Sequence, residues 1–219
     1  TYNGGEARTF TVTGTASPTA GGSVTVNGTD GSASVTQGTR VSLVATPADG
    51  YVFSHWSGGN ITDTSSAAAQ RTTYTVTSVQ GDMDFVAHFT AIPTYTVSGT
   101  ASPSGGGTIS VNGGGASATV TDGESATLVV TTNAGYKFTG WTGGDITGTD
   151  TSTTHTVDNV TSNLSFTANF VPIYNVSYDA NGGTGNPAGE TGILDTDSFT
   201  LPAANSVSLT GSTFAGWYT

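Results

Sequence analysis

The chain of 219 residues contains no cysteine. This absence excludes disulfide bonds, thiolate zinc sites and a thiol nucleophile, so stability must come from packing alone. A cysteine-free chain is compatible with the bacterial or archaeal exterior. The length fits one large domain or two to three small ones, and small domains bury only about 60% of their unfolded surface.

Positive charge is scarce as well. The net charge is −11, and the basic residues are Arg8, Arg40, Arg71 and Lys137. Four scattered cations cannot form the basic stripe that holds a phosphate backbone or an anionic lipid surface. We therefore expect neither nucleic acid nor membrane partners. No apolar run approaches the ~20 residues that span a bilayer, and no signal peptide stands at Thr1, so we expect a mature or excised segment.

Threonine, serine, glycine, alanine and valine dominate the remaining composition, and apolar residues recur at every second position. Thr and Val favour strands, and this alternation indicates half-buried strands. Turns are expected at 21–22, 27–28 and 49–50, because Gly-Gly, Asn-Gly and Asp-Gly pairs suit backbones with positive φ. Residues 65–71 are the one expected helical turn in this part of the chain. The prediction is a mainly β protein.

Internal repeats define the architecture. Residues 10–18 (FTVTGTASP) return as 95–103 (YTVSGTASP), and the match continues without a gap to residue 147. After a contraction of four residues, FVAHF at 85–89 answers FTANF at 166–170. These pairs predict two copies of one module of about 80 residues.

The rest of the chain begins the pattern again. YNVSY at 174–178 resembles the opening strand, and FAGWY at 214–218 resembles the Phe-x-x-Trp element at a shorter spacing. We predict a third, related module that stops before its closing strands. The expected organisation is an N-terminal tail, two modules, and this partial module, at 1–9, 10–90, 95–171 and 173–219. Short proline-containing linkers favour modules arranged end to end as a semi-rigid rod.

These motifs resemble known bacterial surface repeats. The strand opening, the Gly-Gly turn, the Gly-Tyr-x-Phe-x-x-Trp element and the closing Phe-x-Ala-x-Phe are similar to the divergent internalin-B-type repeat. Residues 174–218 resemble the Listeria–Bacteroides repeat. The resemblance implies small β-grasp-like or β-sandwich modules in large surface proteins and adhesins, without catalytic activity.

The family pattern continues after Gly-Trp-Tyr-Thr with a Gly-Gly turn and a final strand, and residues 1–6 (TYNGGE) read like part of that continuation. One interpretation is a window cut from a longer array. The other is a polymer subunit whose N-terminal tail completes the third module of a neighbour by strand addition. In that case Tyr2, Tyr174 and Tyr218 are the candidates for joining subunits.

No catalytic or metal-binding residues are predicted. When the two copies are aligned, the positions of His55, His88 and His155 are occupied in the other copy by Gly140, Asn169 and Tyr74. The three histidines lie in different local contexts and suggest no Ser/His/Asp arrangement. Asp82 with Asp84, and Asp195 with Asp197, are expected in solvated turns. We expect no cofactor, with weak calcium binding as the one functional interpretation of these pairs.

Aromatic pairs recur in every module and allow two interpretations. They are Phe53 with Trp56, Phe138 with Trp141, and Phe214 with Trp217. Small domains need large side chains to fill their cores, so we expect core anchors, whereas exposed pairs would indicate a carbohydrate- or host-binding module. The sequence thus predicts a non-catalytic extracellular scaffold, either a stalk segment of a surface adhesin or a filament subunit. Its expected partners are neighbouring modules or identical subunits.

Overall fold

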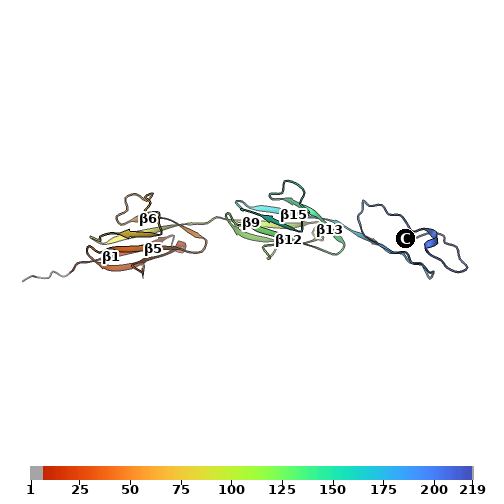
Figure 1. Ribbon diagram of the computed structural model, residues 1–219, viewed down its shortest axis with the longest axis horizontal. Helices are drawn as coiled ribbons and strands as arrows, with labels where there is room; N and C mark the ends of the chain where they lie inside the picture. Colours follow the sequence, from red (N-terminus) through yellow and green to blue (C-terminus); the bar gives the residue numbers. More distant parts are fainter. Residues whose placement is uncertain (1–6, 219) are drawn as a thin grey trace, which may run out of the picture. The chain divides into compact units, whose positions relative to one another are not determined.

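A computed structural model describes residues 7–218, which divide into two compact units with a boundary between Pro93 and Thr94. This part of the chain is nearly all strand and loop, and helix is limited there to two short 3-10 turns (Figure 1). The expected class, mainly β in small tandem modules, is confirmed. None of the helices among residues 7–218 is long and apolar enough to cross a membrane.

The first module contains eight strands and one 3-10 turn. In chain order these are β1 (Thr9–Ser17), η1 (Thr19–Gly21), β2 (Gly22–Val26), β3 (Thr29–Asp30), β4 (Ser32–Thr36), β5 (Val41–Pro47), β6 (Tyr51–Gly58), β7 (Thr73–Val76) and β8 (Met83–Ala91). One sheet has the order β4-β1-β8-β6 and the other β3-β2-β5-β7. The first and last strands, β1 and β8, pair in parallel at the centre of the first sheet, which is a β-grasp-like order. The second sheet contributes to the same core, which makes the module a sandwich.

The second module repeats this arrangement. Its strands are β9 (Thr94–Ser102), β10 (Gly107–Val111), β11 (Ser117–Thr121), β12 (Ala126–Thr132), β13 (Tyr136–Gly143), β14 (Thr154–Val157) and β15 (Leu164–Pro172). The sheet orders are β11-β9-β15-β13 and β10-β12-β14. Even the register is conserved between copies, because Gly14 pairs with Phe85 in the first module and Gly99 pairs with Phe166 in the second.

Alternation along the strands builds one core in each module. In β8 the side chains of Phe85, Ala87 and Phe89 point inward and are buried, while the residues between them are partly exposed. Each of the two cores contains thirteen buried hydrophobic residues and includes the module's tryptophan. Burying such side chains supplies about 1.5–3 kcal/mol each, which is the main stabilising contribution available to a chain without disulfides.

The turn expected at 27–28 has the predicted backbone, and the matching turn of the second module shares it. Asn27 and Gly28 have φ of 50° and 80°, and Asn112 and Gly113 have 52° and 73°. Positive φ at both positions is the geometry of a tight hairpin turn. The Asn27 side chain accepts a hydrogen bond from the Ser42 backbone amide at 2.9 Å, and so ties the turn to strand β5.

The Gly-Gly pairs have a different role from the one predicted. Gly21 ends η1 and Gly22 begins β2, and both lie against the ring of Phe89. A Cβ atom added at Gly21 would lie 2.6 Å from a Phe89 carbon. Glycine is needed here because the closing aromatic residue packs directly on the backbone. Gly106 and Gly107 have the same relation to Phe170 in the second module.

The helical turn expected at 65–71 lies within a series of turns. Only one backbone bond of α-helical spacing forms, from the Gln70 amide to the Ser66 carbonyl at 3.1 Å. The segment instead packs over the tryptophan, because Ala69 is fully buried and its carbonyl accepts a hydrogen bond from the Trp56 amide. Tertiary contact with this side chain therefore determines the loop.

The C-terminal stretch is much less regular. It contains β16 (Tyr174–Val176), β17 (Glu190–Ile193), the 3-10 turn η2 (Ala204–Ser206) and an isolated bridge between Thr184 and Ser208. None of the described residues from 174 to 218 is fully buried, and none belongs to either core.

The packing of glycine against phenylalanine gives a first prediction. The substitution Gly106→Ala should destabilise the second module by about 1–3 kcal/mol, because overpacking a filled core displaces side chains, and the added Cβ would lie 2.5 Å from the Phe170 ring. Gly105→Ala is the matched control, since its Cβ meets nothing closer than 3.5 Å. Urea unfolding measures both variants. Equal stabilities of the two variants would contradict this role of the glycine.

Candidate functional site

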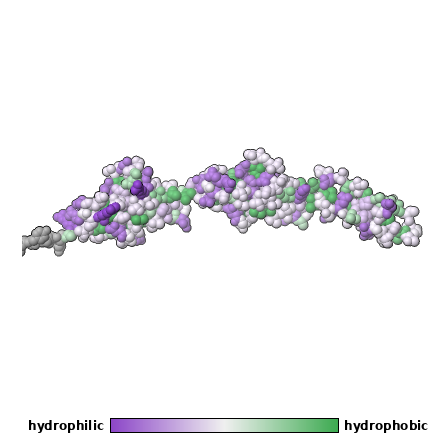
Figure 2. Space-filling model, viewed as in Figure 1, coloured by the Kyte–Doolittle hydropathy of each residue, from purple (hydrophilic) through white to green (hydrophobic). Residues whose placement is uncertain are grey.

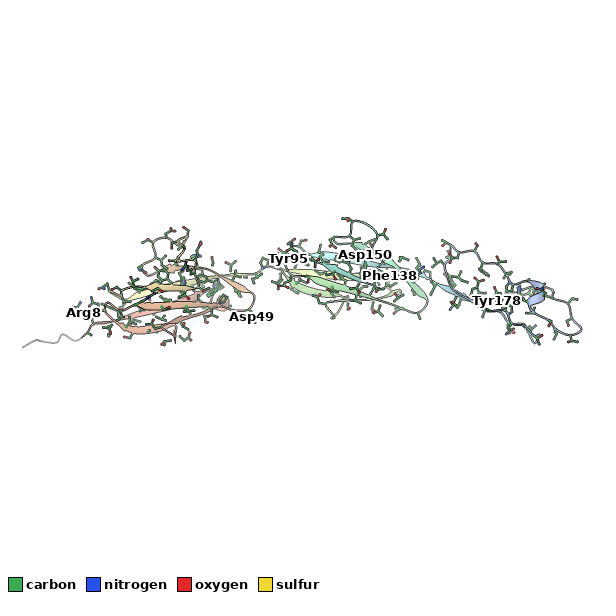
Figure 3. All side chains as sticks on the ribbon, viewed as in Figure 1. Arg8, Asp49, Tyr95, Phe138, Asp150 and Tyr178 are labelled. Carbon is green, nitrogen blue, oxygen red and sulfur yellow. The ribbon has the colours of Figure 1, made fainter. Side chains whose placement is uncertain are left out.

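The aromatic pairs of the first two modules lie inside the protein. Trp56 and Trp141 have exposed fractions of 0% and 2%. Each indole packs against the phenylalanine three residues before it, with ring centroids 5.7 Å apart for Phe53 and 5.6 Å for Phe138. Phe138 is labelled in Figure 3. Stacking on a sugar requires an exposed aromatic face, which neither indole offers.

The indole nitrogens of these tryptophans also have partners. Trp56 Nε1 donates to the Arg71 carbonyl and Trp141 Nε1 to the Ser152 carbonyl, both at 2.9 Å. In each case the acceptor belongs to the loop that follows the strand with the tryptophan, β6 or β13, called here the tryptophan strand. A buried indole N–H that finds a backbone acceptor is satisfied and fixes that loop to the core.

The third aromatic pair has the same internal geometry in a more open setting. Phe214 and Trp217 have ring centroids 5.3 Å apart, and Trp217 Nε1 donates to the Pro202 carbonyl at 3.0 Å. However, Phe214 is 39% exposed, and both residues line an open cavity of about 880 Å³. Their role as core anchors stays a prediction for this module.

Two histidines that were expected in separate contexts lie together. His55 on β6 and His88 on β8 are cross-strand partners, and their rings stack at 4.4 Å with an angle of 10° between planes. Ser54 Oγ lies 2.9 Å from His55 Nδ1, and Ser57 Oγ lies 2.7 Å from His88 Nε2. Among residues 7–218 no carboxylate hydrogen-bonds either ring, so the third group that would orient a catalytic base is missing here.

The second module has Gly140 and Asn169 at the positions of this stacked pair. Asn169 Nδ2 donates to the Gly140 carbonyl at 3.2 Å and to Thr142 Oγ1 at 3.1 Å. Thr142 occupies the position of Ser57. The two modules therefore keep a cross-strand polar contact at this place with different residues, which favours a structural role over a catalytic one.

His155 is held by two carboxylates. Its Nδ1 lies 2.6 Å from Asp150 Oδ2, and its Nε2 lies 3.0 Å from Asp145 Oδ1. Both aspartates belong to the loop after the tryptophan strand, and Asp150 is labelled in Figure 3. With both nitrogens engaged, the imidazole has none left for a substrate. The contacts instead fasten the loop over Trp141, whose amide donates to the Asp150 carbonyl.

The paired carboxylates form no common site. Asp82 accepts a hydrogen bond from the Thr11 amide at 2.7 Å, and Asp84 accepts one from the Thr13 hydroxyl. Asp84 lies within β8, so its expected place in a turn is corrected. Asp197 caps a turn through the Leu194 amide. Within the described part of the chain, no three His, Asp or Glu side chains gather in an arrangement that could hold a metal ion.

The predicted joining residues can be placed in part. Tyr174 and Tyr218 are 51% and 83% exposed, and both belong to the third module. Tyr2 lies outside the described residues. A joining role for all three stays a prediction.

The buried indoles generate a prediction. Trp141→Ala should destabilise the second module by about 3–5 kcal/mol, because it leaves a large cavity and an unpaired loop carbonyl. For a small module this loss should cause unfolding. Tyr218→Ala removes an exposed aromatic residue and serves as the control, with no effect expected on the second module. A normally folded Trp141→Ala protein, observed by hydrogen exchange, would show that the indole is no anchor.

The histidine pair predicts acid sensitivity of the first module. The pKa of His88 is lowered, first because burial disfavours the charged ring and second because His55 repels it. The unfolded chain therefore binds a proton at this histidine more readily than the folded module does. The free energy of unfolding of the first module is then highest above the ordinary histidine pKa of about 6.5 and falls as the pH drops below it. Urea unfolding, monitored by hydrogen exchange, should show that the stability of the first module decreases between about pH 7.5 and pH 5.

The control is His88→Asn, which introduces the residue that the second module carries at Asn169. This variant should lose the pH dependence while keeping the module folded. The interpretation fails if the variant and the original protein lose the same stability on acidification.

Comparison with protein families agrees with the repeated architecture. The model of the divergent InlB B-repeat domain matches residues 11–93 and again 95–174. The model of the Listeria-Bacteroides repeat domain matches residues 174–219. No curated protein matches the chain. The resemblance that the motifs indicated is confirmed. The chain belongs to the divergent InlB B-repeat family, and its two repeats of this family are followed by a Listeria-Bacteroides repeat domain.

Proposed function

We propose that this chain is a non-catalytic extracellular scaffold, a stalk segment of a microbial surface adhesin that carries mechanical load. The supporting observation is the position of the first and last strands in each of the first two modules, which we call the closed modules. β1 and β8 lie side by side in parallel over six paired positions, from Val12 with Met83 to Ser17 with His88. β9 and β15 have the same parallel pairing in the second module.

This pairing gives a physical reason for mechanical strength. The chain enters the module at Thr9, the start of β1, and leaves at Ala91, the end of β8. Tension applied between these ends slides two parallel strands along each other, so their hydrogen bonds are loaded together. Tension across a hairpin loads its bonds one after another, and a smaller force opens it.

The composition supports an exterior location. The surface in Figure 2 is mostly pale, with few strongly hydrophilic spots, as expected for a chain in which 9% of residues are charged. His88, His155 and carboxylates such as Asp82 make hydrogen bonds that fasten loops and strands to each other. Side chains used in this way support a spacer role more than a catalytic or ligand-binding role.

Single-molecule pulling tests the proposal. Because the chain has no cysteine, pairs introduced by substitution are unique attachment points. Thr9→Cys with Ala91→Cys loads the parallel strands in shear. Thr9→Cys with Thr36→Cys loads the antiparallel partners β1 and β4 across their pairing, since Thr9 and Thr36 face each other. We expect a clearly higher unfolding force in the first geometry. Equal forces in both geometries would contradict a load-bearing role.

Self-assembly into a filament or sheath is a second candidate function. The observation that favours it is the third module, where large hydrophobic side chains remain exposed. Negative-stain electron microscopy across a concentration series tests it. Continuous filaments would support a subunit role, and discrete particles at every concentration would support the stalk segment alone.

A further inference from the structure

The stacked histidines of the first module consist of the side chains that most often bind transition metals. His55 lies on β6 and His88 on β8, and the two are register partners in an antiparallel pair. Both side chains are partly exposed, and neither belongs to the core of the module. Cross-strand partners of this kind have Cβ atoms about 4.5–5.5 Å apart. Neutral imidazole is the commonest protein ligand of zinc, copper and nickel.

The spacing of the two rings fits two ligands of one ion. Their centroids are 4.4 Å apart. Two imidazole nitrogens at about 2.0–2.1 Å from one ion place the ring centres roughly 4.5–5.2 Å apart, for bond angles between square and tetrahedral. The ring planes differ by 10°, so the rings must turn about their side-chain bonds before both can point a nitrogen at the same ion. The strands already have the required spacing, and only the side chains need to rotate.

Each ring has one nitrogen that is held and one that is free. Ser54 Oγ lies against His55 Nδ1 and Ser57 Oγ against His88 Nε2. No hydrogen bond within residues 7–218 engages His55 Nε2 or His88 Nδ1. In metal sites a hydrogen bond at the second nitrogen normally orients each histidine. The serine contacts therefore leave one nitrogen on each ring for a metal ion.

The free nitrogens can be reached from solvent. Among residues 7–218 the Tyr178 hydroxyl is the one buried side-chain nitrogen or oxygen without a hydrogen-bond partner. The unpartnered nitrogens of His55 and His88 are therefore not buried. An ion can approach them without opening the core, which contains neither histidine.

We propose that His55 and His88 form a two-histidine binding site for a divalent transition-metal ion, with water in the remaining coordination positions. Nitrogen ligands bind copper more tightly than nickel or zinc. Calcium and magnesium prefer oxygen ligands, and within the described chain no carboxylate hydrogen-bonds either ring. The site therefore differs in chemistry from the calcium binding considered for the aspartate pairs.

The second module provides an internal comparison. Gly140 and Asn169 are register partners at the matching place, and neither supplies an imidazole. The remaining histidine of the chain, His155, has Asp150 against Nδ1 and Asp145 against Nε2. Because both of its nitrogens are engaged, we assign the ion to the first module, and His155 serves as the control.

Titration of the complete chain with nickel chloride tests this inference by calorimetry. At about pH 7.5 most imidazoles with an ordinary pKa near 6.5 are neutral and can bind metal. We expect one ion per chain. His88→Asn should weaken binding at least about tenfold, the smallest loss typical of removing even an outer partner at a metal site. His155→Asn is the matched control and should leave the affinity unchanged.

Two further measurements locate the ion. Pulsed electron paramagnetic resonance with copper should detect two imidazole nitrogens in the original protein and at most one in His88→Asn. Zinc should slow hydrogen exchange in 51–58 and 83–91 and leave the second module unchanged, because a ligand that binds only the folded state stabilises that state. Hydrogen exchange without metal shows whether His88→Asn is folded. If it is not, His55→Asn removes the other ligand.

Several outcomes would overturn the inference. One is an equal nickel affinity of the original protein and a folded variant that lacks one of the two histidines. Another is loss of binding in His155→Asn, or zinc protection centred on 154–157, either of which would place the ion in the second module. Equal protection by calcium and zinc would indicate oxygen ligands and exclude the histidine pair as the site.

Discussion

Closure of each module depends on one strand. β8 and β15 each pair in parallel with the first strand of their module and antiparallel with the tryptophan strand. Each brings two phenylalanines and an alanine into the core, and the second phenylalanine packs on the backbone of the Gly-Gly pair. Because this strand comes last in its module, the cores are completed by contacts between residues about 70 positions apart. The parallel pair that closes the module also lies between its entry and exit points.

The remaining features of the modules follow from a small core without disulfide bonds. One tryptophan supplies much of the buried volume, and its N–H must find an acceptor, so the loop after the tryptophan strand is fixed by it in both copies. The copies fasten that loop differently. Tyr74 donates to Asn60 in the first module, whereas His155 is held by Asp145 and Asp150 in the second. The constraint lies in holding the loop, and the residues that do so can change.

Strands, modules and hairpin turns were predictable from the sequence because alternation, repetition and Asn-Gly pairs are local signals. The stacking of His55 on His88 was missed, although both positions match a cross-strand pair in the other copy, because their register includes a bulge between Phe53 and His55. The role of Gly21 and Gly22 was missed for a related reason. Their partner, Phe89, lies far away in the sequence, so a Gly-Gly pair alone indicates only a turn.

Comparison of the three aromatic pairs separates the packing within each pair from the burial of the pair. Phe214 and Trp217 have nearly the same ring spacing as the pairs of the first two modules. The indole hydrogen bond differs, because the acceptor of Trp217, Pro202, precedes it in the chain, whereas the acceptors of Trp56 and Trp141 follow them. Burial differs, because Trp56 and Trp141 are covered by the loop and the closing strand together. Burial of the aromatic motif at the centre of a core therefore depends on pairing with a closing strand, and the motif alone does not produce it.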